Sequence, residues 1–187
     1  MQEEIKKIVE VLRAGGVILY PTDTVWGLGC DATNEKAVKR IFDIKKRADA
    51  KAMLVLIDNP AKLQSYVEEV PDMAWDLIEL SEKPLTIIYP LAKNLAKNLI
   101  APDKTIGIRV TKEAFSRNLC AQFRNPIVST SANISGSTTP ANFTQVTEEI
   151  KSAVDYIVKF RQDDLSTPKP SSIIKLGQGN LFQLIRE

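Results

Sequence analysis

The pattern of apolar residues along the first part of the chain predicts a helix followed by a strand. Apolar side chains recur three or four residues apart at Ile5, Ile8, Val9 and Leu12. This spacing is typical of one buried helix face, and Gly15-Gly16 directly after it predicts where the helix ends. Residues 17–20 (VILY) are then continuously apolar up to Pro21. A short apolar run stopped by proline is typical of a buried strand.

The rest of the chain alternates in the same way between apolar runs and helical patterns. Further strands are predicted at 53–57, 85–89, 105–110, 127–131, 155–159, 172–176 and 181–185. Helices are predicted after a cap at Thr33 or Asn34, near Pro60, near Pro71, at 112–122 and at 144–152. Several strands near the end lack a helix between them. The pattern therefore predicts an α+β fold, a twisted mixed parallel and antiparallel sheet of about seven strands covered by helices.

Composition and length favour one ordinary domain. The chain has 187 residues, of which 44% are hydrophobic and 26% charged, enough apolar mass for one core, so we expect residues 1–187 to form a single domain. The longest clean apolar runs are far shorter than a membrane span requires. The first residues carry acids and lack the apolar stretch of a signal peptide, so we expect a cytoplasmic protein with no membrane partner.

The absence of histidine excludes several catalytic classes. With no histidine in the chain, Ser-His-Asp and Cys-His mechanisms and imidazole metal sites are excluded. Cys30 and Cys120 are far apart in sequence, and we interpret both as small buried residues. Chemistry must therefore come from lysine, arginine, carboxylates, hydroxyls, backbone amides or a cation that arrives with a substrate.

Positive charge is concentrated in one short stretch. The net charge is only +2, too small to indicate a nucleic-acid-binding protein by itself. Five cations nevertheless cluster at Lys39, Arg40, Lys45, Lys46 and Arg47. From composition alone, such a run is interpreted as a solvated helix face whose last cations complement the helix dipole.

Polar residues stand at the ends of several predicted strands, where proteins with helices and sheets often build sites. They comprise Pro21-Thr22-Asp23-Thr24, Lys45-x-Arg47, Thr86 with Arg109, and Ser129-Thr130-Ser131-Ala132-Asn133. For Arg109 two readings are open, because a lone arginine in a strand either reaches solvent or is paired in a polar pocket. Asp23 and Asp31 could form a carboxylate pair, and turn formation explains them equally well. Trp26 is interpreted as a core residue. The residues alone indicate an anion-binding pocket and go no further.

Taken in order, these segments resemble the YrdC-like threonylcarbamoyl-AMP synthases. The similar segments are YPTDTVWGLGCDA (20–32), IKKRADAKAMLVLI (44–57), PLTIIY (84–89), IGIRVT (106–111), STSANISG (129–136) and KPSSII (169–174). Their specific elements are Lys-x-Arg and Ser-x-Asn, and the length resembles the short bacterial form. The chain departs from the family pattern at Lys46, Ala48, Ser81-Glu82-Lys83 and Ser172. The histidine that longer members carry after Lys-x-Arg is also absent.

The resemblance implies a nucleotidyltransferase that makes threonylcarbamoyl-AMP and pyrophosphate from L-threonine, bicarbonate and ATP. The product would feed N6-threonylcarbamoyladenosine formation at position 37 of tRNA. The resemblance implies Lys45 and Arg47 as catalytic residues. It implies ATP contacts from Lys45, Arg47, Thr86, Ser129, Asn133, Thr139 and Arg186. It implies threonine contacts from Thr22, Thr24, Arg109, Ser131 and Ser171. Mg²⁺ would arrive with ATP, and no tightly bound protein metal site is expected.

The resemblance also implies partners and leaves two other function classes to test. The expected partners are a downstream tRNA threonylcarbamoyl transferase and, through weak binding, tRNA itself. One alternative is an RNA-binding module that uses the basic stretch for backbone contacts. The other is a catalytically silent relative of the same fold. Retention of both Lys45-x-Arg47 and Ser131-x-Asn133 argues against the silent relative.

Overall fold

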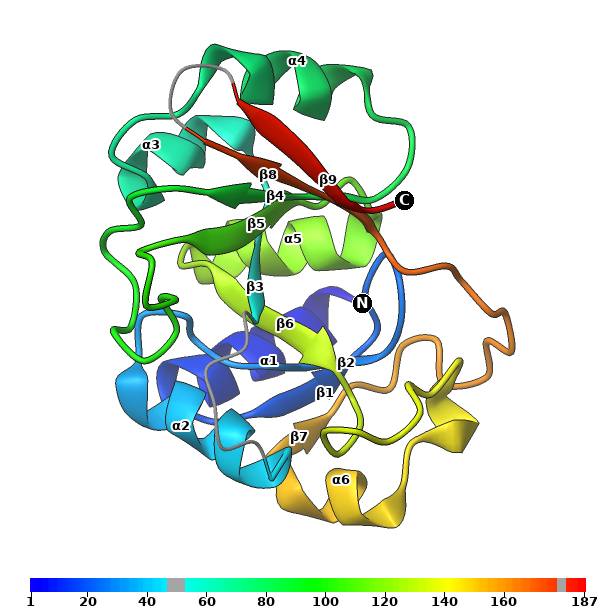
Figure 1. Cartoon of the computed structure of the whole chain (residues 1–187). Coiled ribbons are helices and arrows are strands. Elements are labelled where there is room, and N and C mark those ends of the chain that lie inside the picture. Colours follow the sequence, from blue (N-terminus) through cyan, green and yellow to red (C-terminus); the bar gives the residue numbers. More distant parts are fainter. Residues whose placement is uncertain (47–52, 178–180) are drawn as a thin grey trace.

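A strongly twisted mixed sheet forms the centre of the molecule, and helices lie on both of its faces (Figure 1). The structure is a computed structural model that describes residues 1–46, 53–177 and 181–187. In this part of the chain, nine strands follow the order β7-β1-β2-β6-β3-β5-β4-β8-β9. They are β1 (Ile18–Tyr20), β2 (Gly27–Gly29), β3 (Leu54–Ile57), β4 (Leu85–Tyr89), β5 (Ile106–Val110), β6 (Ile127–Ser131), β7 (Tyr156–Ile157), β8 (Ser172–Leu176) and β9 (Phe182–Arg186). The predicted α+β class and mixed sheet are confirmed.

The helices stand where the apolar periodicity places them. They are α1 (Gln2–Arg13), α2 (Glu35–Ile44), α3 (Leu63–Tyr66), α4 (Asp72–Leu80), α5 (Ala114–Phe123) and α6 (Glu148–Ala153), with short 3₁₀ turns η1 (Pro60–Lys62) and η2 (Phe143–Gln145). Asn34 is the residue that caps α2, because its side chain accepts hydrogen bonds from the backbone amides of Lys36 and Ala37.

The count of about seven strands was too low, and β2 is a strand that the sequence analysis did not predict. Glycine is a poor strand former, but here two glycines permit a close approach. A Cβ atom on Gly29 would lie 2.6 Å from the Tyr20 ring, and one on Gly27 would lie 3.0 Å from the Thr130 carbonyl oxygen. The glycines therefore let β2 fit between β1 and β6, and any larger side chain would push the strands apart.

Two buried clusters lie on opposite faces of the sheet, as the alternation of side chains along each strand requires. One cluster joins α1 and α5 to Ile18, Leu56 and Ile127. The other joins α2, α3 and α4 to neighbouring strand positions such as Leu19 and Val55. Cys30 and Cys120 are buried in these clusters, and Trp26 packs against Phe143 with ring centroids 4.8 Å apart. The core interpretation of all three residues is confirmed.

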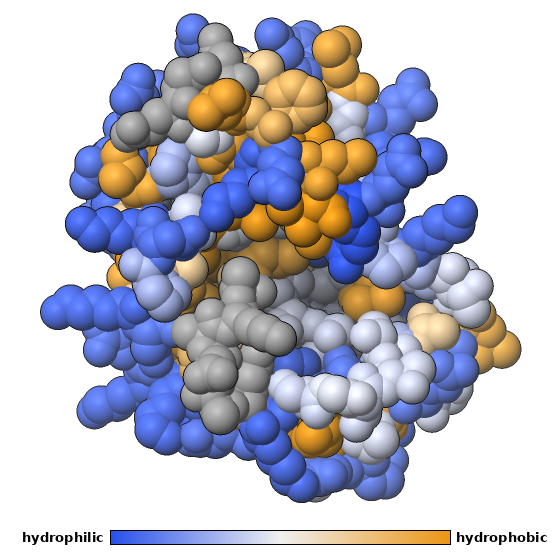
Figure 2. Space-filling view, in the orientation of Figure 1, coloured by the Kyte–Doolittle hydropathy of each residue, from blue (hydrophilic) through white to orange (hydrophobic). Residues whose placement is uncertain are grey.

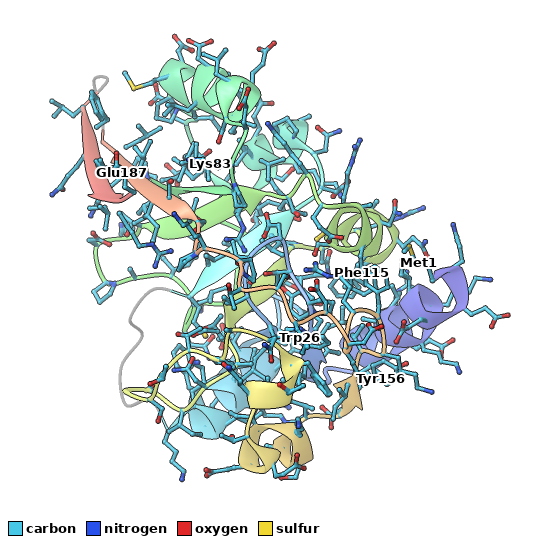
Figure 3. The ribbon with its side chains drawn as sticks, turned by 90° about the vertical axis from the view of Figure 1, so that its right-hand side faces the viewer. Met1, Trp26, Lys83, Phe115, Tyr156 and Glu187 are labelled. Carbon is cyan, nitrogen blue, oxygen red and sulfur yellow. The ribbon has the colours of Figure 1, made fainter. Side chains whose placement is uncertain are left out.

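The face that carries Leu56 also carries small and polar side chains further along the strands. On β5, Arg109 lies opposite Leu56 and Gly107 opposite Leu54, and Ser129 of β6 is also opposite Leu54. A Cβ atom on Gly107 would lie 3.4 Å from Thr86 of β4, so Thr86 belongs to the same face. Figure 2 shows a hollow between the β8–β9 hairpin and the segment that follows β6. The register therefore gathers the polar strand residues that the sequence singled out.

A candidate nucleotide and amino-acid site

Lys45 joins two of the polar segments that the sequence singled out. It follows the last residue of α2, and only 2% of it is exposed. Its Nζ donates to the carbonyl oxygen of Ser131 and, at 2.7 Å, to that of Asn133. The backbone amide of Ser135 in turn donates to the Lys45 carbonyl at 2.9 Å. A buried ammonium is stable here because backbone carbonyls replace its hydration.

The interpretation of the basic stretch as a solvated face was therefore wrong for Lys45 and right for Lys39, Arg40 and Lys46. Lys39 pairs with Asp43 and Arg40 with Asp155, all four on the surface. The Lys46 side chain is 65% exposed and pairs with Glu149. Arg47 lies outside the described residues, as does the departure at Ala48. The sequence could not separate Lys45 from Lys46, because both are lysines at a helix end and only the fold buries one of them.

Asn133 closes its loop with its amide nitrogen and leaves its amide oxygen unpartnered. Its Nδ2 donates to the carbonyl oxygens of Ile134 at 3.0 Å and Ser137 at 2.7 Å. Its Oδ1 is buried and has no hydrogen-bond partner among the residues that the structure describes. A buried acceptor without a donor costs free energy, and such atoms in a native structure call for an explanation such as a ligand or a water. This oxygen is therefore suited to accept a hydrogen bond from a ligand.

The turn after β1 is held by its own threonine hydroxyls. Thr22 Oγ1 donates to the carbonyl of Val25 at 2.7 Å and accepts from the backbone amide of Thr24 at 3.1 Å. The two hydroxyl oxygens lie 3.1 Å apart. Gly27 joins this turn to β6, because a Cβ atom there would meet Thr22 Cγ2 at 3.6 Å and Ser129 Oγ at 3.7 Å. The first and fourth polar groups of the sequence are therefore neighbours.

Arg109 is paired, not directed to solvent. Its Nη2 lies 3.0 Å from Asp23 Oδ1, and the two side chains are only 3% and 9% exposed. Burial raises the pKa of Asp23, an effect that the Arg109 charge opposes. Burial likewise lowers the pKa of Arg109, and the Asp23 charge opposes that change. Within the described part of the chain, Asp23 Oδ1 and Arg109 Nε have no aligned hydrogen-bond partner, so the pair is held by charge and keeps unused hydrogen-bonding capacity.

Asp23 does not form the carboxylate pair with Asp31 that we considered. Asp31 Oδ1 accepts from the amide and hydroxyl of Thr33, at 2.9 and 2.7 Å. This is the turn-forming role that we gave as the other explanation. Asp23 is a residue whose role in the site the sequence analysis missed, because its partner Arg109 is distant in sequence and no local pattern connects the two.

A third group lies on β4, on β9 and at the residue directly before β8. Thr86 Oγ1 and Ser171 Oγ are 2.9 Å apart and buried. Arg186 donates from Nε to the Ser171 carbonyl at 2.9 Å and has Nη2 3.4 Å from Ser171 Oγ. The parallel pairing of β4 with β8 and the antiparallel pairing of β8 with β9 produce these contacts. The sheet pairing thus brings the hydroxyls of Thr86 and Ser171 and the guanidinium of Arg186 into one group.

The structure brings together most of the predicted site residues, in three groups that share one region of the sheet. The first is Lys45 with the Ser131 and Asn133 loop. The second is the turn after β1 with the Asp23–Arg109 pair and Ser129, and the third is Thr86 with Ser171 and Arg186. Thr139 is the exception among the described residues, because it is exposed in the segment after β6 and contacts none of the three groups by a hydrogen bond or ion pair. Among the described residues, no group of three or more cysteines, aspartates and glutamates gathers as a metal site would require. No helix of the described part is long and apolar enough to cross a membrane.

Comparison with known proteins identifies the family of the chain. The family model Sua5_yciO_yrdC, described as "Telomere recombination", matches residues 10–187. The chain belongs to the Sua5/YciO/YrdC family. The family assignment confirms the resemblance on which the sequence analysis relied.

Several members of the Sua5/YciO/YrdC family resemble the chain over nearly its whole length. A threonylcarbamoyl-AMP synthase of Pseudoalteromonas translucida is 35% identical, covering 97% of this chain and 98% of that protein. The structure of Escherichia coli YciO is 28% identical with a TM-score of 0.86, covering 100% of this chain and 90% of that one. Pyrococcus abyssi Sua5 complexed with L-threonine is 27% identical with a TM-score of 0.81, covering 92% of this chain. The chain spans 50% of that Sua5 chain.

Proposed function

We propose that the protein is a threonylcarbamoyl-AMP synthase, with residues 1–187 acting as one YrdC-like domain. The observation that carries the proposal is the contact of Lys45 with the Ser131 and Asn133 carbonyls. This contact joins the Lys-x-Arg and Ser-x-Asn elements, which stand far apart in the sequence. Relatives with the name threonylcarbamoyl-AMP synthase match nearly the whole chain, which supports the same reaction.

The proposed reaction has two steps. The amine of L-threonine attacks the carbon of bicarbonate, with loss of water, or of CO₂, with loss of a proton, and forms a carbamate. A carbamate oxygen then attacks the α-phosphorus of ATP, and the bond to the bridging oxygen of pyrophosphate breaks. Neither step needs a covalent bond to the protein, so positioning and neutralisation of phosphate charge can supply most of the rate. A chain without histidine can therefore catalyse this nucleotidyl transfer.

Each group of the site has a proposed role in this reaction. Lys45 and Arg47 would act on the phosphates, with ATP also contacting Thr86, Ser129, Asn133, Thr139 and Arg186. L-Threonine would contact Thr22, Thr24, Arg109, Ser131 and Ser171. Mg²⁺ would be held mainly by the ATP phosphates, since the cation prefers phosphate oxygens and water to a cage of protein ligands. The exposure of Thr139 makes it the weakest of these assignments.

The direct test is incubation with labelled ATP, L-threonine, bicarbonate and Mg²⁺. The expected product is the threonylcarbamoyl adduct of AMP, formed together with pyrophosphate. In the cell, we propose that this product forms in the cytoplasm and is used by a tRNA threonylcarbamoyl transferase. A chain that forms no adduct but binds tRNA with steep salt dependence would be an RNA-binding module. The ion pairs of Lys39, Arg40 and Lys46 favour the enzyme, because they neutralise most of the basic stretch described.

ATP and L-threonine are each expected to raise the temperature of unfolding, and both together are expected to raise it further. A ligand that binds only the folded chain, present at about a hundred times its Kd, adds about 2.7 kcal/mol of stability. The expectation follows because the candidate ATP and threonine residues share one region of the sheet. The measurement is a thermal unfolding curve with Mg²⁺ and millimolar ligands. A curve that neither ligand moves would count against the synthase.

L-Serine is expected to be a poorer substrate than L-threonine. The two amino acids differ by one methyl group, and a methyl group in a fitted pocket contributes roughly 1–3 kcal/mol. The ratio of kcat/KM for threonine over serine is therefore expected to be about tenfold or more. Steady-state rates of adenylate formation with each amino acid measure this ratio. Equal values of kcat/KM would show that Thr22 and Thr24 do not border a fitted pocket.

A further inference from the structure

Arg161, which had no role in the sequence analysis, contacts the turn that carries Thr22 and Thr24. It lies in the segment between β7 and β8, and its guanidinium has two partners. The Nε and Nη2 atoms donate to Asp164 Oδ2 at 3.0 and 2.8 Å. The Nη1 atom donates to the backbone carbonyl of Thr22 at 3.2 Å. One side chain therefore ties the 161–164 segment to the turn after β1, 139 residues away in sequence.

The backbone at Arg161 is itself unusual. Its φ angle is 63°, in the left-handed region where a Cβ atom is disfavoured. The three guanidinium contacts hold the residue in this conformation. The cavity between the 161–168 segment and the turn has a volume of only about 10 Å³, room for about one water molecule. The segment is thus packed closely on the turn, and a shift of Arg161 would be transmitted to Thr22.

The direction of each hydrogen bond in the turn follows from counting protons. Thr22 Oγ1 carries one proton, and the Val25 carbonyl, which can only accept, takes it at 2.7 Å. Thr22 Oγ1 can then only accept from its other two neighbours. It accepts from the backbone amide of Thr24 and therefore also from the Thr24 hydroxyl, 3.1 Å away. The Thr24 hydroxyl has thus given its only proton to Thr22, and its oxygen can only accept from a ligand.

An acceptor-only hydroxyl fits one part of an amino acid. A free amino acid at neutral pH carries an ammonium group, which has three donors and no acceptor, as the lysine ammonium does. A carboxylate, which can only accept, would find no donor at Thr24. The direction of the hydrogen bonds in the turn thus favours an ammonium or an N–H group of a ligand at Thr24 Oγ1.

We propose that Arg161 is a positioning residue for the amino-acid part of the site. It holds the Thr22 carbonyl and so keeps the turn in the arrangement that leaves Thr24 Oγ1 as an acceptor for the amino group of the substrate. The proposal rests on the proposed function, since it takes L-threonine as the amino acid. It assigns Arg161 no contact with ATP, so loss of Arg161 is expected to change the KM for threonine and not the KM for ATP.

The test compares Arg161→Gln and Arg161→Lys with the wild type. Arg161→Gln is expected to raise the KM for threonine about tenfold, the equivalent of about 1.4 kcal/mol, with kcat and the KM for ATP within about twofold of wild type. The KM of Arg161→Lys for threonine is expected to lie between those of the wild type and Arg161→Gln. One ammonium can reach the Thr22 carbonyl or Asp164 but does not span both as a planar guanidinium does. A purely structural role would change neither KM selectively.

Arg40→Gln is the matched control. Arg40 also binds one aspartate with two nitrogens, at 2.6 and 3.2 Å from Asp155, and this pair lies outside the three groups of the site. Both glutamine variants are expected to lower the unfolding temperature by a similar small amount. Only Arg161→Gln is expected to change the KM for threonine.

Three results would overturn the proposal or separate it from the proposed function. An unchanged KM for threonine in Arg161→Gln would overturn it, and so would an equal rise in both KM values. If the wild type makes no adenylate, the proposed function fails, and calorimetric titration with L-threonine alone decides the inference. Weaker threonine binding by Arg161→Gln than by the wild type would support it. Equal binding, or no binding to the wild type, would overturn it.

Discussion

Replacing Lys45 with methionine is expected to lower the rate of adenylate formation by about 10²–10³, the loss seen when a preorganised donor is removed from an active site. Methionine retains much of the length of the lysine side chain and removes the charge. Without the ammonium, the carbonyls of Ser131 and Asn133 lose the donor that holds them at the end of α2. The proposed catalytic effect therefore has two physical sources, the lost charge and the displaced Ser-x-Asn loop.

Lys46→Met is the matched control for this prediction. The Lys46 side chain is exposed and pairs only with Glu149 among the contacts described, so its loss is expected to change stability by no more than about 0.5 kcal/mol and to leave activity near wild type. Lys45→Met is expected to lose stability as well, about 1–3 kcal/mol, because buried carbonyls are left without a donor. Rates are therefore measured well below both unfolding temperatures. Mild and equal rate effects at the two lysines would remove Lys45 from the catalytic residues.

The structure changes one part of what the sequence predicts for this test. A lysine at a solvated helix end could be replaced with little change in the unfolding temperature, whereas the 2% exposure of Lys45 is the reason that a loss of stability is expected here. For Arg47, outside the described residues, loss of activity on replacement by alanine stays a prediction from the sequence.

Local patterns predicted most of the secondary structure because their causes are local. The apolar spacing of Ile5 to Leu12 produces α1, and the run of residues 127–131 produces β6. The strand β2 was missed for the opposite reason. Gly27-Leu28-Gly29 has little strand propensity, and its pairing with β1 and β6 comes from close approach to Tyr20 and Thr130. A contact of this kind is visible only once the neighbouring strands are placed.

The residues of the candidate site could be selected from the sequence, whereas the contacts between them could not. The resemblance to a family selected Lys45, Ser131, Asn133, Thr86 and Ser171, which the fold brings into hydrogen-bonded groups. It gave no reason for the burial of Lys45 or for the interaction of Arg161 with Thr22. These interactions depend on the direction of one side chain across the sheet, information that composition, spacing and periodicity do not contain.

Replacing Asp23 with alanine is expected to destabilise the fold by about 3–5 kcal/mol, the cost of leaving one partner of a buried ion pair uncompensated. Arg109 would keep its charge among buried groups, at 3% exposure. The free energy of unfolding in urea measures the loss. Asp43→Asn is the control, because Asp43 pairs with Lys39 at 63% exposure and a surface pair contributes only about 0–1 kcal/mol.

Arg109→Met is expected to destabilise the fold in a different way, because Asp23 can become neutral by binding a proton. Burial already raises the pKa of Asp23, and the Arg109 charge opposes this effect, so removing Arg109 raises the pKa further. The folded chain then binds the proton more tightly than the unfolded chain, whose aspartate has a pKa of about 3.9. The contribution of the Asp23 proton to the stability of Arg109→Met is therefore fully present below that value and is lost as the pH rises through the folded-state pKa. Asp23→Ala has no such carboxyl, so its deficit relative to wild type should depend less on pH between about 5 and 7. A deficit of Arg109→Met that stays constant over this range, or grows as the pH falls, would show that Asp23 is not a buried carboxylate held ionised by Arg109.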